Sequence, residues 1–428
     1  NFVETAILRD SAGNFATLAI DASGNLYVMQ YGAIVWAVPL GAPAAATIAG
    51  KRMTVAFVSG TTYIYFANVA CYVYTFATNT MAIQALAGLT ANLITGVVAV
   101  RGYMIAYTTQ SVFWSSTLTP VDFVPDLTTG AGGGQLEGAR GTITTIEAVY
   151  GGMIVFTSGN AVAATSSDNV RFPFNFLEIT GCGGLANPLH VSLDANSSSL
   201  YAYTTAGMQS ISLKQAIVVF PEVTDFLSGS SFEDFDESIN QFSITNTSGI
   251  PIVRKLVVVG SRYLVISYGI TNLTHAIVYD LSYKQWGKLK IPHVDCFEWS
   301  RTSTEIPKKN IAFLDSGGGV NTLNTDINNP TASGIMVLGK YQYVRTRLMQ
   351  LQRVAFENVN PENTFSLYDL PSLDGKNFGT ALVGYLAVNS GKFREYTFHN
   401  TALNHTLLAK GGFNAVSIVL TFNITGAR

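Results

Sequence analysis

Gly152-Met-Ile-Val-Phe156, Ser158-Gly-Asn160 and Ala161-Val-Ala-Ala-Thr165 form two apolar runs joined by a short turn of small residues. β-Branched and large apolar side chains favour packed strands. Glycine and asparagine supply the positive φ angles that a tight hairpin requires. The stretch therefore predicts a buried β-hairpin.

The same pattern recurs along the chain. First strands of the hairpin are expected near residues 25, 62, 103, 152, 200, 263 and 310, with gaps of 37, 41, 49, 48, 63 and 47 residues. Propeller blades, each a four-stranded sheet, repeat at about 40–50 residues. Seven copies at this spacing predict an all-β fold with a six- or seven-bladed β-propeller-like domain. An array of β-sandwiches is the alternative.

A change of pattern near residue 328 predicts a second domain. Asn328-Asn-Pro-Thr-Ala-Ser-Gly334 has the composition of a linker, and alternating strands such as Lys392-Phe-Arg-Glu-Tyr-Thr-Phe398 follow it. We expect residues 1–327 to form the propeller-like domain, with an insertion at about 228–249 inside the longest gap. Residues 335–428 are expected to form a small antiparallel β-sandwich.

Charge is scarce in this chain. Charged residues make up 12% and hydrophobic residues 48% of the sequence, whereas soluble domains usually carry about 25% charge. The mean hydropathy is +0.28. No run approaches the roughly 18–20 apolar residues of a membrane helix, so no membrane span is predicted. The composition favours a surface buried against partners, and a surface rich in Ser, Thr, Asn and Gly is the alternative.

The charge balance and the cysteines narrow the function classes. The net charge is −2 and no basic stripe is present, which disfavours an ordinary DNA-binding domain. A neutral or acidic wall that DNA slides past stays open, because strong phosphate contacts would retard movement. Cys71, Cys182 and Cys296 are odd in number and far apart. They predict buried free thiols rather than disulfides or a metal site.

The residue types that hydrolytic propellers use are present, but they do not form the pattern of an active site. The best match to an Asp-box is Ser166-Ser-Asp168-Asn-Val170, where valine replaces the glycine. Three convergent arginines would be needed to hold a substrate carboxylate, but Arg101, Arg140 and Arg262 are scattered. The five histidines are isolated as well. We predict that the chain is not an enzyme and has no catalytic residues, no metal and no cofactor.

Two segments are candidate channel or interface loops. Phe232-Glu-Asp-Phe-Asp-Glu237 lacks the glycine and ligand spacing of a calcium loop, and its place in the insertion predicts a solvated or channel-facing loop. Gly130-Ala-Gly-Gly-Gly134 lacks the Lys-Ser/Thr of a phosphate-binding loop and is expected to be a flexible linkage between blades. The candidate residues are Glu233, Asp234, Asp236, Glu237, Gly132, Gly133 and Gly134.

One passage carries a resemblance to a known family. Val112-Phe-Trp-Ser-Ser116, Pro120-Val-Asp-Phe-Val-Pro125 and Thr128-Thr-Gly-Ala-Gly132 read as a strand ending in Trp-Ser, a Pro-x-Asp-Phe turn and a Thr-Gly-rich loop. A blade beginning at Ile146 follows, and Gln285-Trp286 looks like a blade ending. Over roughly residues 95–290 the chain resembles tail hub or nozzle proteins of short-tailed bacteriophages, similar to the packaged-DNA-stabilisation component. Residues 335–428 carry no family-specific signature.

The resemblance implies a structural virion protein that is assembled in the host cytoplasm and resides in the phage tail. Such subunits form a homo-oligomeric ring, a hexamer, around the channel that retains packaged DNA and lets it pass at ejection. The implied partners are copies of the same chain, the head-to-tail adaptor and other tail proteins such as fibres, spike or needle. Contact with double-stranded DNA would be transient and non-specific.

Two other function classes stay open. A carbohydrate-binding or glycan-hydrolysing propeller would stack sugars on exposed aromatic side chains, for which Tyr201, Tyr203 and Trp299 are candidates. An extracellular adhesion protein is supported only by the Thr-, Asn- and Gly-rich composition.

Overall fold

A computed structural model gives the fold of the chain. It describes residues 2–30, 35–167, 169, 172–194, 199–228, 234–236, 241–243, 252–269, 273–282, 284–299, 310–322, 334–341, 347–357, 365–373, 382–389, 393–402, 404–411 and 417–427. The chain divides into two compact units. The first contains residues 1–227, 251–286 and 290–323, and the second contains residues 228–250, 287–289 and 324–428.

Among the described residues, the first unit consists of seven consecutive antiparallel sheets. The first sheet and the last sheet have three strands each, and the five between them have four. In chain order the sheets are β1 (Phe2–Arg9), β2 (Phe15–Asp21) and β3 (Leu26–Gln30); β4 (Met53–Val58), β5 (Thr61–Phe66), β6 (Ala70–Thr75) and β7 (Thr80–Gln84); β8 (Gly96–Val100), β9 (Tyr103–Tyr107), β10 (Ser111–Trp114) and β11 (Gly132–Gln135); β12 (Ile143–Val149), β13 (Gly152–Thr157), β14 (Ala161–Ser166) and β15 (Phe174–Glu178); β16 (Val191–Asp194), β17 (Ser199–Thr204), β18 (Gly207–Ile211) and β19 (Ala216–Val218); β22 (Ile252–Val259), β23 (Tyr263–Gly269), β24 (Leu273–Asp280) and β25 (Gln285–His293); and β26 (Asp295–Trp299), β27 (Asn310–Leu314) and β28 (Val320–Thr322).

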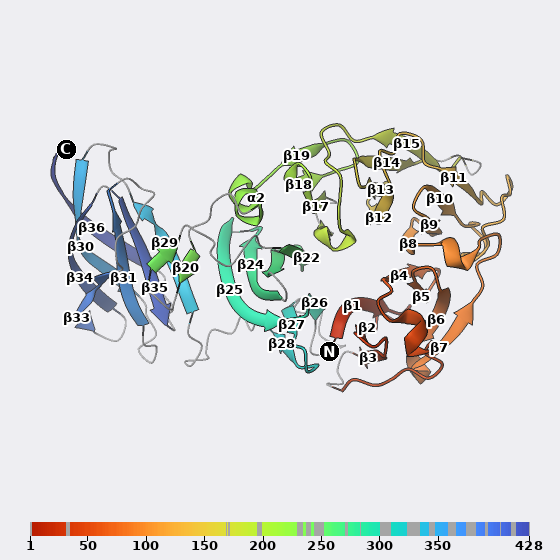
Figure 1. Ribbon diagram of the computed structural model, residues 1–428, viewed down its shortest axis with the longest axis horizontal. Helices are drawn as coiled ribbons and strands as arrows, with labels where there is room; N and C mark the ends of the chain where they lie inside the picture. Colours follow the sequence, from red (N-terminus) through yellow and green to blue (C-terminus); the bar gives the residue numbers. More distant parts are fainter. Residues whose placement is uncertain are drawn as a thin grey trace. The chain divides into compact units, whose positions relative to one another are not determined.

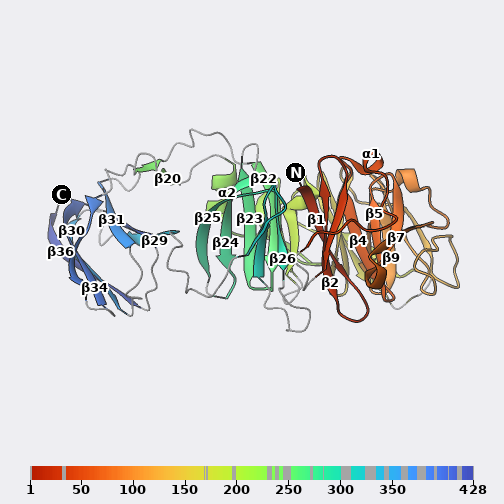
Figure 2. The ribbon, with the colours of Figure 1, turned by 90° about the horizontal axis from the view of Figure 1, so that it is seen from below.

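The sheets of this unit are arranged as the blades of a propeller. Figure 1 shows them around a common centre, with β1, β4, β8, β12, β22 and β26 innermost, and Figure 2 shows their strands from the side. Neighbouring sheets share cores: one core contains Leu18 of the first sheet and Ile64 of the second. Another contains Phe2 of the first sheet and Phe297 of the last, so the ring closes. The all-β, propeller-like fold predicted from the repeat is confirmed.

The first repeat of the predicted pattern was misplaced. The run that starts at Asn25 is the third strand of its sheet. Among the described residues that follow it, Ala37 makes only an isolated bridge to Val28, so the expected hairpin partner is not formed there. The hairpin of this sheet is β2–β3, whose turn is Asp21-Ala-Ser-Gly-Asn25. Asp21 accepts from the backbone N–H of Ser23 at 2.9 Å and of Asn25 at 2.8 Å. An aspartate that caps its own turn in this way makes the turn specific.

Helices are few and short in the described residues. The α-helices are α1 (Ala45–Ile48) and α2 (Pro221–Leu227), and the 3₁₀ helices are η1 (Phe76–Thr78), η2 (Ala91–Leu93) and η3 (Pro188–His190). None of the described helices is long and apolar enough to cross a membrane.

The second unit contains two four-stranded antiparallel sheets with a shared core. One sheet has the order β29-β35-β31-β32 and the other has the order β33-β34-β30-β36. Their strands are β29 (Gly334–Tyr341), β30 (Arg347–Glu357), β31 (Phe365–Ser372), β32 (Leu382–Val383), β33 (Tyr385–Asn389), β34 (Phe393–Ala402), β35 (Asn404–Gly411) and β36 (Ser417–Ala427). Leu367 and Leu407 of the first sheet pack with Phe356 and Phe398 of the second, which is the arrangement of a β-sandwich.

The inserted segment between the fifth and sixth sheets groups with the second unit. It contains the antiparallel pair β20 (Asp234–Asp236) and β21 (Gln241–Ser243). The predicted linker at 328–334 lies outside the described residues except for Gly334, where β29 begins. The domain boundaries drawn from the sequence stay predictions.

Candidate functional site

A buried carboxylate joins the first strand of the ring to its last two sheets. Asp295, the first residue of β26, is 3% exposed. Its Oδ2 accepts from the backbone N–H and the hydroxyl of Thr5 in β1, each at 2.7 Å. Its Oδ1 lies 2.7 Å from Nζ of Lys255 in β22. Burial alone would lower the pKa of Lys255, but the charge and the hydrogen bond of Asp295, together with smaller effects of other nearby groups, outweigh burial and raise the pKa. The three side chains form a clamp that closes the ring.

Arg52 makes a similar connection among the second, third and fourth sheets. It precedes β4, and its guanidinium donates to the hydroxyl of Tyr107 at 3.1 Å. It also donates to the carbonyl of Thr144 and the hydroxyl of Thr145, each at 3.0 Å. Gly96 leaves room for this contact, because a Cβ there would lie 2.5 Å from the Tyr107 hydroxyl. Arg52 therefore spans from the second sheet across the third to the fourth.

Two glutamates lie within the electrostatic influence of Arg52, and one of them also within that of Lys255. Glu4 of β1 and Glu147 of β12 are half-buried by accessible surface, yet protein surrounds them on nearly all sides. Burial raises the pKa of each to about 7, against the lowering effect of Arg52. Together with Arg52, Lys255 and Asp295 they form a group of five charged residues, the axial cluster. Each of the five lies in or directly before the first strand of a different sheet.

A serine and a histidine beside the axial cluster resemble catalytic partners in geometry alone. Nε2 of His293 lies 2.9 Å from Oγ of Ser267, and this Oγ lies 3.3 Å from Sγ of Cys296. The carbonyl of Ile291 is 2.7 Å from Nδ1 of His293, which makes Nε2 the acceptor. Ser267 and Cys296 have no exposed surface, and burial raises the pKa of Cys296 to about 11. A substrate has no access, so these groups connect the sixth and seventh sheets.

The glycine run predicted as a flexible linkage is instead a strand. Gly132, Gly133 and Gly134 lie in β11, which pairs with β10 from Ser111 to Trp114. β11 is the outermost strand of its sheet, three strands away from β8. These glycines therefore do not line the axis. Close approach of β10 requires glycine at one position of the run, because a Cβ on Gly133 would lie 2.6 Å from the Cα of Phe113.

Replacement of Gly133 by alanine is expected to destabilise the first unit by about 1–3 kcal/mol. Gly133 has a φ of 147°, and a Cβ there would lie 2.5 Å from the carbonyl oxygen of Val112. Gly134→Ala is the matched control, because nothing lies within 4 Å of its Cβ position. Urea unfolding of both variants checks the prediction, and equal stabilities would contradict it.

The acidic candidates of the insertion are only partly described. Asp234 and Asp236 begin and end β20, opposite Ser243 and Gln241 of β21. Glu233 and Glu237 lie outside the described residues. Within the described residues no group of three or more His, Cys, Asp or Glu side chains could hold a metal ion.

The three arginines lie in separate places in the structure, as the sequence predicts. Arg101 is exposed in the turn between β8 and β9. Arg140 and Arg262 pair with Glu178 and Asp280 in the fourth and sixth sheets, at 3.0 and 3.1 Å. Asp168, the centre of the incomplete Asp-box, lies outside the described residues.

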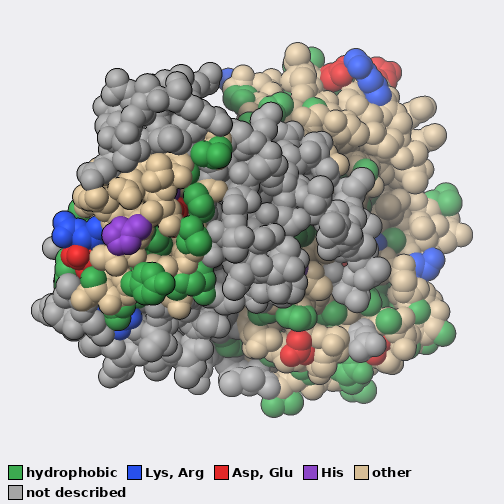
Figure 3. Space-filling model, turned by 60° about the vertical axis from the view of Figure 1, so that its left-hand side comes forward, with side chains coloured by type: hydrophobic (Ala, Val, Ile, Leu, Met, Phe, Trp, Pro, Cys, Tyr) green, Lys and Arg blue, Asp and Glu red, His purple; other side chains and the backbone are tan. Residues whose placement is uncertain are grey.

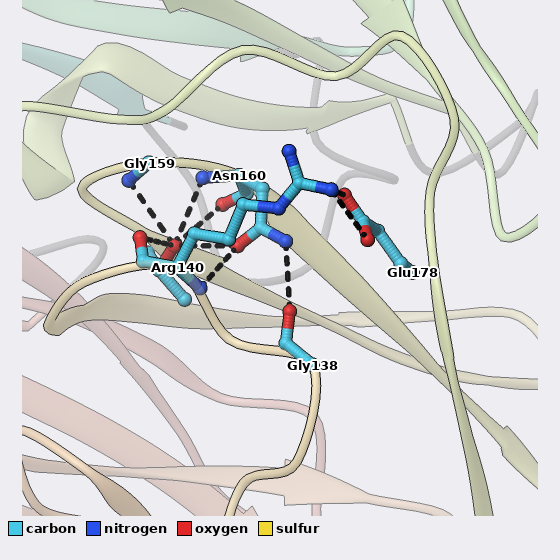
Figure 4. A network of polar contacts seen from close by, with 6 residues as sticks. Gly138, Arg140, Gly159, Asn160 and Glu178 are labelled. Atoms are coloured by element: carbon cyan, nitrogen blue, oxygen red, sulfur yellow. Dashed lines mark hydrogen bonds and ion pairs between the residues drawn. The ribbon is translucent and has the colours of Figure 1, made fainter.

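A cavity of about 500 Å³ lies beside the Arg140–Glu178 pair. Figure 4 shows how Asn160 positions this pair, since its side chain accepts from the backbone N–H of Arg140 and donates to the carbonyl of Gly138, each at 2.9 Å. The half-buried Cys182 also lines the cavity, and burial raises the pKa of its thiol to about 12. A neutral thiol is a poor nucleophile.

Three sequence interpretations of single residues need correction. Tyr201, Tyr203 and Trp299, proposed as exposed sugar platforms, are half-buried. Tyr201 stacks on Phe220, with ring centroids 6.3 Å apart, and Trp299 packs into the core between the last and first sheets. The histidines are not all isolated, because His293 contacts Ser267 and His405 contacts an aspartate. Cys182 is half-buried, whereas Cys71 and Cys296 are the buried free thiols that were predicted.

Comparison with known proteins yields similarity to solved propeller structures and no match in sequence. No family model and no curated protein matches the chain. The WD40 β-propeller domain of Doa1 is similar over 76% of this chain and 97% of its own, at 8% identity and a TM-score of 0.43. The β-propeller domain of Cps50 (Swd1) from Myceliophteria thermophila is similar over 75% and 98%, at 11% identity and a TM-score of 0.41.

A third structure is similar over more of this chain. The extracellular domain of the putative hybrid two-component system BT3049 from B. thetaiotaomicron matches 94% of this chain and 52% of its own, at 10% identity and a TM-score of 0.44. Likeness at this level carries no functional argument for any of the three.

Proposed function

We propose that this protein is a non-enzymatic structural subunit that assembles with copies of itself through the outer edges of its propeller sheets. Ile83 of β7 and Leu177 of β15 are both 73% exposed. Ile217 and Val218 of β19 are 52% and 54% exposed. Outer strands with exposed apolar side chains are interaction sites or aggregation hazards unless something covers them. This apolar rim is the observation that carries the proposal.

Four of the outer strands also carry little charge. Natural edge strands carry lysine, other charges or proline, which discourage pairing with another chain. The outer strands β7, β11, β15 and β19 carry a single charged residue among them, Glu178. On the described surface that Figure 3 shows, charged side chains are few and most of the surface is hydrophobic or uncharged. A surface of this kind supports assembly with neighbours on both sides of each subunit.

The assembly we propose is a ring in the tail of a short-tailed bacteriophage, which holds packaged DNA and lets it pass at ejection. The sequence passage from Val112 to Gly132 supports this identity. Its segments correspond to β10, to a turn in which Phe123 is buried and to the turn before β11. The axial cluster occupies the centre of the propeller. In this proposal DNA therefore passes between subunits and not through a single propeller.

The native mass of the purified chain tests the proposal. We expect light scattering to give about six times the chain mass and negative-stain images to show a ring with a central opening. Leu177→Lys combined with Ile217→Lys is expected to shift the particle to the monomer mass, because each buried contact would then hold an unpaired charge. Ser11→Lys, at an exposed position in the turn between β1 and β2, is the control and should leave the ring intact. A stable wild-type monomer at micromolar concentration in low salt would overturn the proposal.

A further inference from the structure

Glu4 and Glu147 are enclosed carboxyl groups without an ion pair. Oε2 of Glu4 accepts from the backbone N–H of Met53 at 3.3 Å. Among the described residues, the one hydrogen bond that the Glu147 side chain makes is a long one of 3.5 Å from the Thr145 hydroxyl. No described Lys or Arg is in an ion pair with either glutamate. Two acidic side chains in the centre of the ring are therefore poorly compensated.

The nearby cations are engaged elsewhere. Lys255 is paired with Asp295 at 2.7 Å. Arg52 donates three hydrogen bonds to neutral oxygens of Tyr107, Thr144 and Thr145. Its charge acts on both glutamates at longer range, but it donates to neither of them. Three of the five N–H donors of Arg52 are used in this way, which holds its guanidinium between the second sheet and the fourth.

We propose that Glu4 and Glu147 form a proton-operated fastener of the propeller, closed when both carboxyls are protonated and loosened when they ionise. The element that it controls is β1. Glu4 holds this strand to Met53 of β4, and the neighbouring Thr5 holds it to Asp295 of β26. An ionised Glu4 faces Asp295 as a like charge and competes with Glu147 for Arg52. Ionisation therefore weakens the place where the ring closes.

The groups that face the fastener come from every strand packed against it. Arg52 and the Met53 amide face Glu4 from the β4 side, Lys255 from β22 and Asp295 from β26. Glu147 faces Arg52 and Thr145, and its charge also acts on the Tyr107 hydroxyl of β9. Because both glutamates share Arg52, their protons are expected to be released in coupled steps that belong to the pair.

The direction of the pH effect follows from proton linkage. Burial raises the pKa of each glutamate from 4.5 to about 7. Between these two values the folded chain binds more protons than the unfolded chain, so stability falls as pH rises from about 4.5 to 7. Each glutamate multiplies the unfolding equilibrium constant by up to about tenfold per pH unit in this window.

The test compares unfolding and hydrogen exchange of the full chain from pH 5 to pH 8. In the wild type, we expect the unfolding constant to rise with pH, and amides of β1 to lose protection by a larger factor than amides of β13. Glu4→Gln and Glu147→Gln mimic the protonated state, so each should remove up to about tenfold per pH unit from this dependence. Glu137→Gln, at an exposed position, is the control and should leave the dependence unchanged.

A second measurement uses the wild-type protein, so its result does not depend on whether a variant folds. The infrared absorption of protonated carboxyl groups in the wild type should persist at pH 6 and disappear by pH 8. The proposal is overturned if the Gln variants keep the wild-type pH dependence, or if no carboxyl absorption titrates above pH 6. If the protein forms no ring but shows both the pH-dependent unfolding and the titrating carboxyl absorption, the proposed assembly is overturned and the proposal for Glu4 and Glu147 is retained.

Discussion

Asp295→Ala is expected to lower the free energy of unfolding of the first unit by about 3–5 kcal/mol, the cost of breaking a buried ion pair by removing one partner. The substitution leaves Lys255 inside the protein without its counter-charge, and it leaves the N–H and hydroxyl of Thr5 without their acceptor. The loss should concentrate where the ring closes. Urea unfolding, followed by hydrogen exchange in β1 and β26, measures it.

A double-mutant cycle separates the two parts of this loss. Asp295→Asn keeps an acceptor for Thr5 but removes the charge, so Lys255 alone is unpaired. The combination of Asp295→Asn with Lys255→Met removes both charges and should recover part of the stability, because a buried pair can be replaced by neutral groups at little cost. A loss below about 1 kcal/mol in Asp295→Ala would contradict the role of the clamp.

His405→Ala is expected to destabilise the second unit by a similar amount, about 3–5 kcal/mol. His405 and Asp369 have no exposed side-chain surface, and Nδ1 of the histidine lies 2.8 Å from Oδ2 of the aspartate. Nε2 lies 2.9 Å from the carbonyl oxygen of Met349. Both ring nitrogens face acceptors, and this arrangement favours the doubly protonated ring. Removal of the ring leaves the aspartate with only the amide of Asn400, at 3.0 Å.

The same pair makes the second unit sensitive to pH. Burial alone would lower the pKa of His405, but the hydrogen bond and the charge of Asp369 outweigh it and raise the pKa above 6.5. This contribution to stability is therefore complete below pH 6.5 and is lost as pH rises through the raised pKa. Hydrogen exchange in β30, β34 and β35 as a function of pH measures it without assuming that the two units unfold together.

The exposed His399 provides the matched control for both measurements. It lies on β34 of the same unit, and His399→Ala is expected to change stability by less than about 0.5 kcal/mol. If His399→Ala and His405→Ala are equally stable, or if His405→Ala keeps the wild-type pH dependence, the buried ion pair does not stabilise the second unit.

Much of the fold was predictable because its signal is local. The run from Gly152 to Phe156 is buried throughout as part of β13, and its hairpin partner begins at Ala161. The apolar side chains of such short runs are buried when the run is a strand of a packed sheet, whichever segments lie next to it. The predicted position of the first repeat is wrong for an equally local reason. Asp21-Ala-Ser-Gly-Asn25 is the turn between β2 and β3, so the run after it is the second strand of that hairpin and not the first.

The role of the glycine run could not be predicted from composition. Glycine serves equally in flexible linkages and in strands that approach a neighbour closely. The choice depends on the distance between Gly133 and the backbone of β10, which no local pattern contains. The same holds for Tyr201, whose exposure depends on the neighbouring Phe220.

The sequence by itself determined the class of the fold, the hairpin as its unit and the scarcity of charge, since all three depend on residues close together in the chain. Only the tertiary structure decided which charges meet. Glu4 and Asp295 are 291 positions apart in the chain, yet both belong to the axial cluster. A weak signal existed, because each of the five charges lies in or directly before a first strand that is rich in apolar residues. Closure of the ring brings these strands together, which pairs Lys255 with Asp295. The burial that results raises the pKa of Glu4 and Glu147.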